Sequence, residues 1–170
     1  IDAARCLPQS RPRMFLIGAR EDVVLGGLAA TGPNGPFHTP KVRAFVDRLP
    51  KRLARDWIWW SHVVPRGQNR SLRRIVEQHP DTPWYDDQDV SKLLSLMSPP
   101  SQSRVMAARR SGKEEIGMLY KRGRPDANGK NRQRAEIRFD GLAGCLRTPA
   151  GGSSRQTIMF IRGNETRARL

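Results

Sequence analysis

The turn segment Pro125–Gly129 constrains the fold of this chain more than any other feature. Its tip is Asn128-Gly129, and an Asn-Gly pair between two alternating runs is the strongest short-range signal for a β-hairpin. The flanking runs, Ile116–Lys121 and Ala135–Phe139, alternate apolar and polar side chains. The pattern therefore predicts two antiparallel strands joined by a tight turn.

Capping residues and helical periodicity predict short helices ahead of this hairpin. Thr39-Pro40 and Ser98-Pro99 each combine an N-cap residue with a first-turn proline. The helices are expected from Thr39-Pro40 to about Pro50, from Asn69 or Ser71 to Glu77, from about Asp87 to Met97, and from Ser98-Pro99 to Arg110.

Strands are predicted near both ends of the chain. The run Met14–Ala19 is short and apolar, which is typical of a strand buried on both faces. A last strand is expected from about Gln156 to Ile161, followed by a turn at Gly163-Asn164. The predicted fold is therefore mixed α+β, with short helices and an antiparallel hairpin region.

The charge balance favours an anionic partner. The 170 residues include 31 Lys and Arg against 16 Asp and Glu, a formal net charge of +15, and 25 of the basic residues are Arg. Arg binds phosphates and base edges bidentately, whereas Lys offers a point charge. No apolar run approaches the roughly 20 residues of a membrane helix. Two cysteines, Cys6 and Cys145, and three scattered histidines predict neither a disulfide framework nor a metal site.

Basic residues crowd the predicted hairpin. A two-stranded ribbon fits the DNA major groove, and Arg is the commonest side chain that recognises guanine. The alternative is a solvated edge hairpin whose charges prevent association between sheets. The candidate DNA-binding residues here are Lys121, Arg122, Arg124, Lys130, Arg132 and Arg134.

Two further segments have the composition of anion-binding loops. The first is Pro8-Gln9-Ser10-Arg11-Pro12-Arg13, in which Arg11 and Arg13 point the same way if the strand begins early. The second is a Gly-rich loop with Thr148, Gly151, Gly152, Ser153, Ser154 and Arg155, which offers close backbone approach and several donors. A solvated basic turn and a flexible connection are the respective alternatives.

Both segments resemble parts of the DNA (cytosine-5) methyltransferases. Pro8-Gln9-x-Arg11-x-Arg13, followed by Met-Phe-Leu-Ile-Gly, is similar to the eighth conserved motif of that family. The stretch from Leu146 to Ile158, and then Gly163 to Leu170, resembles the end of the target-recognition domain entering the ninth motif. The two occur in the family's order, at a separation that accommodates a recognition domain.

The resemblance implies a division of the chain and roles for its residues. Residues 1–20 would be the turn and one strand of the α/β catalytic domain, 21–155 the target-recognition domain, and 156–170 the return strand and the start of the ninth motif. Arg11 and Arg13 would hold the flipped cytosine and a nearby phosphate, with Gln9 supporting them. Thr148, Gly151 and Gly152 would belong to the recognition loop. The parent enzyme would transfer a methyl group from S-adenosylmethionine to carbon five of a cytosine taken out of the stack.

The departures from the family pattern define what this chain is expected to lack. Neither cysteine follows a proline, no Glu-Asn-Val sequence is present, and the cofactor loop is missing. We therefore expect an internal piece of a longer enzyme, inactive alone, with no bound cofactor or metal. The expected partners are duplex DNA and the rest of the catalytic domain, in a bacterial restriction-modification setting at the cytoplasmic nucleoid. The alternatives are a free-standing basic DNA- or RNA-binding module, or an enzyme that uses residues within this chain.

Overall fold

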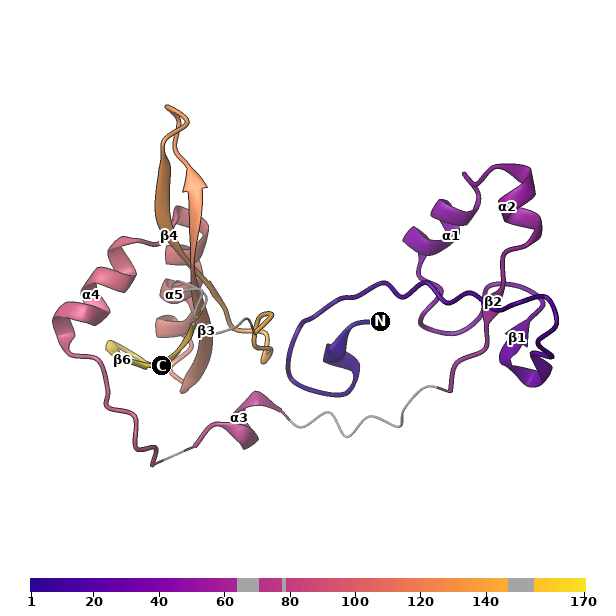
Figure 1. Ribbon diagram of the computed structural model, residues 1–170. Helices are drawn as coiled ribbons and strands as arrows, with labels where there is room; N and C mark the ends of the chain where they lie inside the picture. The colour runs from indigo at the N-terminus through magenta and orange to yellow at the C-terminus, as the bar shows by residue number, and fades with distance from the viewer. Residues whose placement is uncertain (64–70, 78, 147–154) are drawn as a thin grey trace. The chain divides into compact units, whose positions relative to one another are not determined.

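The computed structural model describes residues 1–63, 71–77, 79–146 and 155–170. The chain divides into two compact units: the first contains Ile1 and residues 13–66, and the second contains residues 2–12 and 67–170. Across the described residues the fold is mixed α+β, as predicted, with a two-stranded and a four-stranded antiparallel sheet (Figure 1).

The first unit is built from short elements around an aromatic cluster. His38 is buried; its Nδ1 accepts a hydrogen bond from the backbone N–H of Asn34 at 2.8 Å, and its ring lies 4.9 Å from that of Trp59. Trp57 in turn packs edge-on against Trp59, so these partly buried rings pack together in a small aromatic cluster. The elements are the 3-10 helix η2 (Gly26–Leu28), β1 (Ala29–Ala30), α1 (Pro40–Val46), α2 (Lys51–Arg55) and β2 (Trp59–Trp60).

Helix α1 begins where its capping residues predict. The Thr39 hydroxyl accepts a hydrogen bond from the backbone N–H of Val42 at 3.4 Å, and Pro40 occupies the first turn. The helix ends at Val46, earlier than the expected limit at Pro50, and Pro50 instead precedes α2.

The predicted strand over Met14–Ala19 is wrong for this structure. Residues 13–20 have no regular secondary structure, and Met14, Phe15, Leu16 and Ile17 are 52–71% exposed. A strand requires a neighbour to pair its backbone groups, and none of the described strands pairs with this segment. The apolar composition of the segment predicted burial, but composition does not identify a second strand with which the segment could pair.

The second unit contains most of the regular structure. Its four-stranded sheet has the order β4-β3-β5-β6, and every neighbouring pair is antiparallel. The elements are η1 (Ala3–Arg5), α3 (Leu72–Ile75), α4 (Asp87–Ser95), α5 (Pro99–Arg110), β3 (Glu115–Pro125), β4 (Asn131–Arg138), β5 (Gln156–Arg162) and β6 (Glu165–Arg169).

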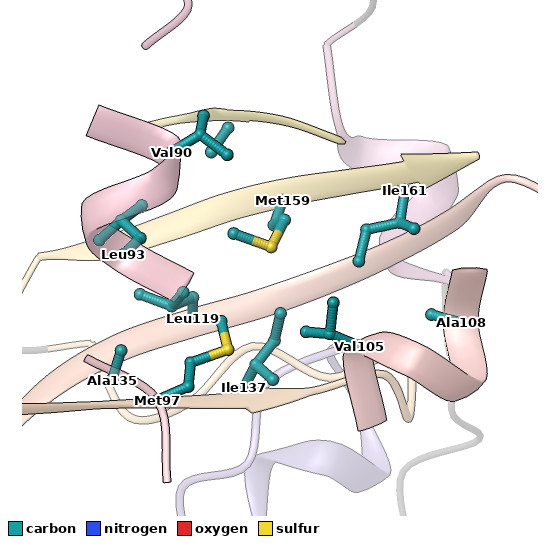
Figure 2. Packing of buried hydrophobic residues seen from close by; sticks show 11 residues of the cluster. Val90, Leu93, Met97, Val105, Ala108, Leu119, Ala135, Ile137, Met159 and Ile161 are labelled. Atoms are coloured by element: carbon teal, nitrogen blue, oxygen red, sulfur yellow. The ribbon is translucent and has the colours of Figure 1, made fainter. Parts of the chain in front are cut away.

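The sheet is covered on both faces. On one face, Val90 and Leu93 of α4 and Val105 of α5 pack with Met159 and Ile161 (Figure 2). On the other face, the α3 region contributes Leu72 and Val76 to a second cluster, with Ile116, Met118 and Phe160 of the sheet. Strand β3 is therefore buried at consecutive positions rather than at alternate ones.

The predicted hairpin is confirmed, with longer strands than the alternating runs indicated. Asp126 and Lys130 close the turn through a backbone bond of 2.9 Å, and Gly129 has a φ of +76°, which favours glycine. The Asp126 carboxylate also accepts the backbone N–H groups of Asn128 and Lys130. The last strand and the turn at Gly163-Asn164 are confirmed as well.

Candidate nucleic-acid interface

The tip half of the hairpin stands free of the sheet. Strand β3 pairs with β5 only over Glu115–Tyr120, whereas its pairing with β4 continues to Pro125. Residues 121–134 therefore form a two-stranded ribbon beyond the four-stranded sheet, which we name the hairpin arm (Figure 1).

The hairpin arm is strongly basic and has no core of its own. It contains six cationic side chains and one carboxylate, a formal net charge of +5, and no large apolar side chain. All six candidate hairpin residues from the sequence lie on it: Lys121, Arg122, Arg124, Lys130, Arg132 and Arg134. The structure thus gathers these residues on one projecting element.

The strand register places four guanidinium groups on one face of the arm. Arg122 lies opposite Arg134, and Arg124 lies opposite Arg132. Residues two apart in a strand share a face, so both pairs point the same way. Like charges directly opposite each other repel, and this face therefore requires nearby anions or an anionic partner. We name these four residues the arginine face.

Two carboxylates hold part of the arginine face in place. Glu136 Oε1 accepts hydrogen bonds from Arg124 Nε at 3.0 Å and Nη2 at 2.8 Å, and Glu136 Oε2 lies 4.0 Å from Arg122 Nε. Asp126 Oδ2 accepts from Arg132 Nε at 2.7 Å. Among the described residues, Arg134 forms no ion pair. The arginine side chains of these pairs are 50–62% exposed while the two carboxylates are partly buried, so solvent screens the pairs and their contribution to stability is small.

The pKa values at the base of the arm follow from this arrangement. Burial raises the pKa of Glu136, but hydrogen bonds from Arg124 and Tyr120 outweigh it, so the pKa lies below its ordinary value. Burial raises the pKa of Tyr120, and its bond to Glu136 raises it further. Glu136 is therefore a carboxylate and Tyr120 a neutral donor at neutral pH.

The segment containing Gln9 and Arg11 pairs with the chain that follows β4. Ser10 donates its N–H to the Ala143 carbonyl at 2.8 Å, and Ala143 donates to the Pro8 carbonyl at 2.8 Å. The Gln9 side-chain amide lies 3.5 Å from the Gly144 carbonyl oxygen, 135 residues further along the chain.

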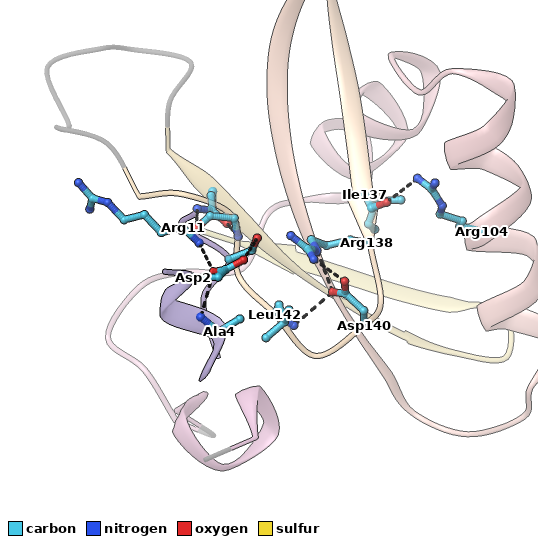
Figure 3. Close-up of polar contacts among 11 residues, drawn as sticks. Asp2, Ala4, Arg11, Arg104, Ile137, Arg138, Asp140 and Leu142 are labelled. Atoms are coloured by element: carbon cyan, nitrogen blue, oxygen red, sulfur yellow. Dashed lines mark hydrogen bonds and ion pairs between the residues drawn. The ribbon is translucent and has the colours of Figure 1, made fainter. Parts of the chain in front are cut away.

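Asp2 fixes the shape of this segment. Its carboxylate accepts the backbone N–H of Arg11 at 2.8 Å and that of Ala4 at 3.0 Å (Figure 3). These bonds leave the Arg11 side chain exposed, and Figure 3 shows its guanidinium pointing away from Asp2. Arg11 is therefore available to an anion.

Gln156 connects the backbone at Gly144 to the hairpin. Its side-chain Oε1 accepts the Gly144 N–H at 2.8 Å, and its Nε2 donates to the Gly144 carbonyl at 2.9 Å. In the sheet Gln156 lies opposite Tyr120, the last β3 residue before the arm. The segment with Gln9 and Arg11, the flanks of the Gly-rich loop and the base of the arm thus meet at one end of the sheet.

An open groove continues this surface beside β4. It has a volume of about 520 Å³, and its polar lining includes Arg104, Tyr120, Arg138 and Asp140. Arg104 donates to the Ile137 carbonyl at 3.1 Å, and Arg138 forms a two-bond ion pair with Asp140 (Figure 3).

The remaining sequence-predicted residues fall elsewhere. Arg13 is exposed and belongs to the first unit. Arg155 is exposed at the start of β5. Thr148, Gly151, Gly152, Ser153 and Ser154 lie outside the described residues. Sequence reasoning missed the structural parts of Asp2 and Tyr120. A two-residue turn at Asn128-Gly129 would pair Tyr120 with Ile137, whereas the observed loop closes between Asp126 and Lys130 and pairs Tyr120 with Glu136.

Comparison of the chain with family models, with curated proteins and with solved structures finds no match. In the described part of the chain, no helix is both long and apolar enough to cross a membrane.

Proposed function

We propose that this chain is the DNA-docking and target-recognition region of a DNA (cytosine-5) methyltransferase. The observation that supports this best is the meeting of its two motif-like segments. Gln9 and Gln156 both bond Gly144, although they belong to segments at opposite ends of the sequence. The resemblance requires these segments to act on the same DNA, and their proximity fits that requirement.

In this proposal the chain's own residues bind and position the duplex. The hairpin arm and Arg155 bind phosphates and base edges, and Arg11 binds an anion beside them. Arg13 would act with Arg11 in the parent enzyme, where S-adenosylmethionine supplies the methyl group. The nucleophile would come from another part of the enzyme, because this sequence contains no Pro-Cys dipeptide. We expect no methyl transfer by this chain alone.

Fluorescence anisotropy of the 170-residue chain with labelled duplex DNA tests the proposal. We expect binding that favours duplex DNA over matched RNA and weakens steeply with salt, because phosphate contacts release counterions. A preference for duplexes with particular cytosine-containing sites distinguishes a methyltransferase region from a basic module without enzymatic parentage. Tighter binding to RNA, or no binding to duplex DNA, contradicts the proposal.

Arg13→Ala tests the family assignment in the complete enzyme. If Arg13 acts on the flipped cytosine, this change lowers turnover far more than duplex affinity. Equal losses in turnover and affinity would mean that Arg13 contacts only a phosphate and does not act on the cytosine.

A further inference from the structure

The two faces of the hairpin arm differ in chemistry. One is the arginine face, with Arg122, Arg124, Arg132 and Arg134. The other presents one cation, Lys121 at the base of the arm, then Gly123 opposite Gln133 and Pro125 opposite Asn131. The Asn131 amide lies over Gly123, where an added Cβ would be 2.8 Å from its oxygen. Charge is therefore concentrated on one side of the ribbon.

The dimensions of the arm match a DNA major groove. Its paired residues, from Arg122 to Pro125 and from Asn131 to Arg134, span about 14 Å at 3.4 Å per residue. The strands of a ribbon are about 4.8 Å apart, and the major groove is about 12 Å wide. The arm has no apolar face that must be buried against protein, so it can enter the groove as it stands.

The carboxylates at the arm leave free the donors that guanine requires. Arg has five N–H donors. Glu136 takes two from Arg124, and Asp126 takes one from Arg132. Each guanidinium keeps at least three, and a bidentate contact with guanine O6 and N7 uses two. Holding the side chain in advance lowers the entropy lost when it binds.

We propose that the arginine face recognises guanines in the major groove of duplex DNA, with Arg124 and Arg132 oriented by Glu136 and Asp126. The proposal rests on the proposed function for its partner, duplex DNA, and adds the bases and the side chains that recognise them. Glu136 and Asp126 are positioning residues, since they act through the arginines. Lys121 and Lys130 bind phosphates.

Selection from a randomised duplex pool with the complete chain identifies the preferred sites. We expect guanine steps to be enriched. Arg124→Lys and Arg132→Lys keep the charge but lose the guanidinium fork, so each lowers the preference for guanine over adenine at one position by roughly ten- to a hundredfold. Arg110→Lys, at the exposed end of α5, is the matched control and leaves the preference unchanged.

Glu136→Gln separates orientation from simple charge. Removal of a carboxylate that only repels DNA would raise affinity for every sequence equally. If Glu136 orients Arg124, the variant lowers the guanine preference at the same position as Arg124→Lys. Circular dichroism melting of each variant confirms that the fold persists.

The outcomes distinguish this inference from the proposed function. Duplex binding without guanine enrichment, or equal losses on all sequences in both Arg→Lys variants, overturns the inference and leaves DNA docking in place. Absence of duplex binding overturns both.

Discussion

At the scale of single residues, Gln156 and Gly144 form the contact that joins distant segments. The amide side chain uses its donor and its acceptor on one backbone unit, so both polar groups of Gly144 are satisfied. A Cβ on residue 144 would lie 3.3 Å from Gln156 Oε1, which is tighter than an ordinary contact. The absence of a side chain at Gly144 therefore permits this close pairing.

Gln156→Ala tests this contact. It leaves the half-buried Gly144 N–H without its partner and leaves the Gly144 carbonyl only the longer contact with Gln9, so we expect the free energy of unfolding of the second unit to fall by about 1–3 kcal/mol. Urea denaturation followed by circular dichroism measures the loss. Gln133→Ala, an exposed residue on the arm, is the control and changes stability by about 0.5 kcal/mol or less. Equal effects of the two changes would contradict the assigned contact.

The pKa of Glu136 gives a second residue-scale prediction. Because this pKa is lower in the folded protein than in the unfolded chain, the carboxylate stabilises the fold at neutral pH, and that contribution is lost as the pH falls below the ordinary Glu value. NMR titration of the Glu136 carboxyl measures the pKa directly. We expect Arg124→Ala to raise it.

Arg134→Ala is the control for that titration. Arg134 shares the arginine face but forms no ion pair with Glu136, so its removal should move the pKa less than removal of Arg124. Equal shifts would mean that general charge, rather than the hydrogen bond, sets the pKa.

At the scale of helices and strands, capping and turn residues predicted the elements that depend only on residues close in sequence. Thr39-Pro40 and Ser98-Pro99 precede real helices, although the Ser98 side chain makes no capping bond. The Asn128-Gly129 pair predicted the hairpin, but the loop has three residues between Asp126 and Lys130, so the register differs by one residue from that of a two-residue Asn-Gly turn. The strand over Met14–Ala19 was predicted from composition alone and is wrong here, because pairing requires a second strand that composition does not supply.

Strand β3 gives the prediction at this scale. Leu119 is fully buried in the cluster beneath α4 and α5. Leu119→Ala leaves a cavity there, so we expect the free energy of unfolding to fall by about 2–5 kcal/mol. Chemical denaturation checks this value. Leu146→Ala is the control, and it should have little effect because this side chain is 56% exposed. Equal changes in the free energy of unfolding for the two variants would contradict the assignment of Leu119 to the core.

The candidate site was predictable only in part, for the same physical reason. The basic character of the arm is visible in the sequence, but the register depends on a three-residue loop that the Asn-Gly pair alone does not indicate. The contacts of Gln9 and Gln156 with Gly144 depend on how the sheet folds, so no local pattern indicates them. The expectation that Arg11 and Arg13 point the same way required a strand that begins early, and residues 13–20 form no strand.

At the scale of the whole molecule, the net charge of +15 makes salt dependence the most informative property of DNA binding. Each phosphate contact contributes about 0.9 to the slope of log K against log salt. Replacing Lys121 and Lys130 by Gln should reduce that slope by about 1–2, because neither forms an ion pair within the described residues. Anisotropy titrations over a salt series measure it.

The matched control for the salt series lies in the first unit. Lys51 and Arg52 are exposed, and replacing both by Gln removes the same charge. A smaller change in slope assigns the phosphate contacts to the arm. An equal change would mean that DNA responds to total charge rather than to this surface.

The bond pair between Gln156 and Gly144 also has a consequence for how such a protein diversifies. It ties together the described chain on either side of residues 147–154, at Gly144 and Gln156. Closing a longer loop between fixed ends costs little, about 0.6 kcal/mol for each doubling of length. We therefore expect this stretch to be exchangeable, in length and composition, while the scaffold that presents it stays the same.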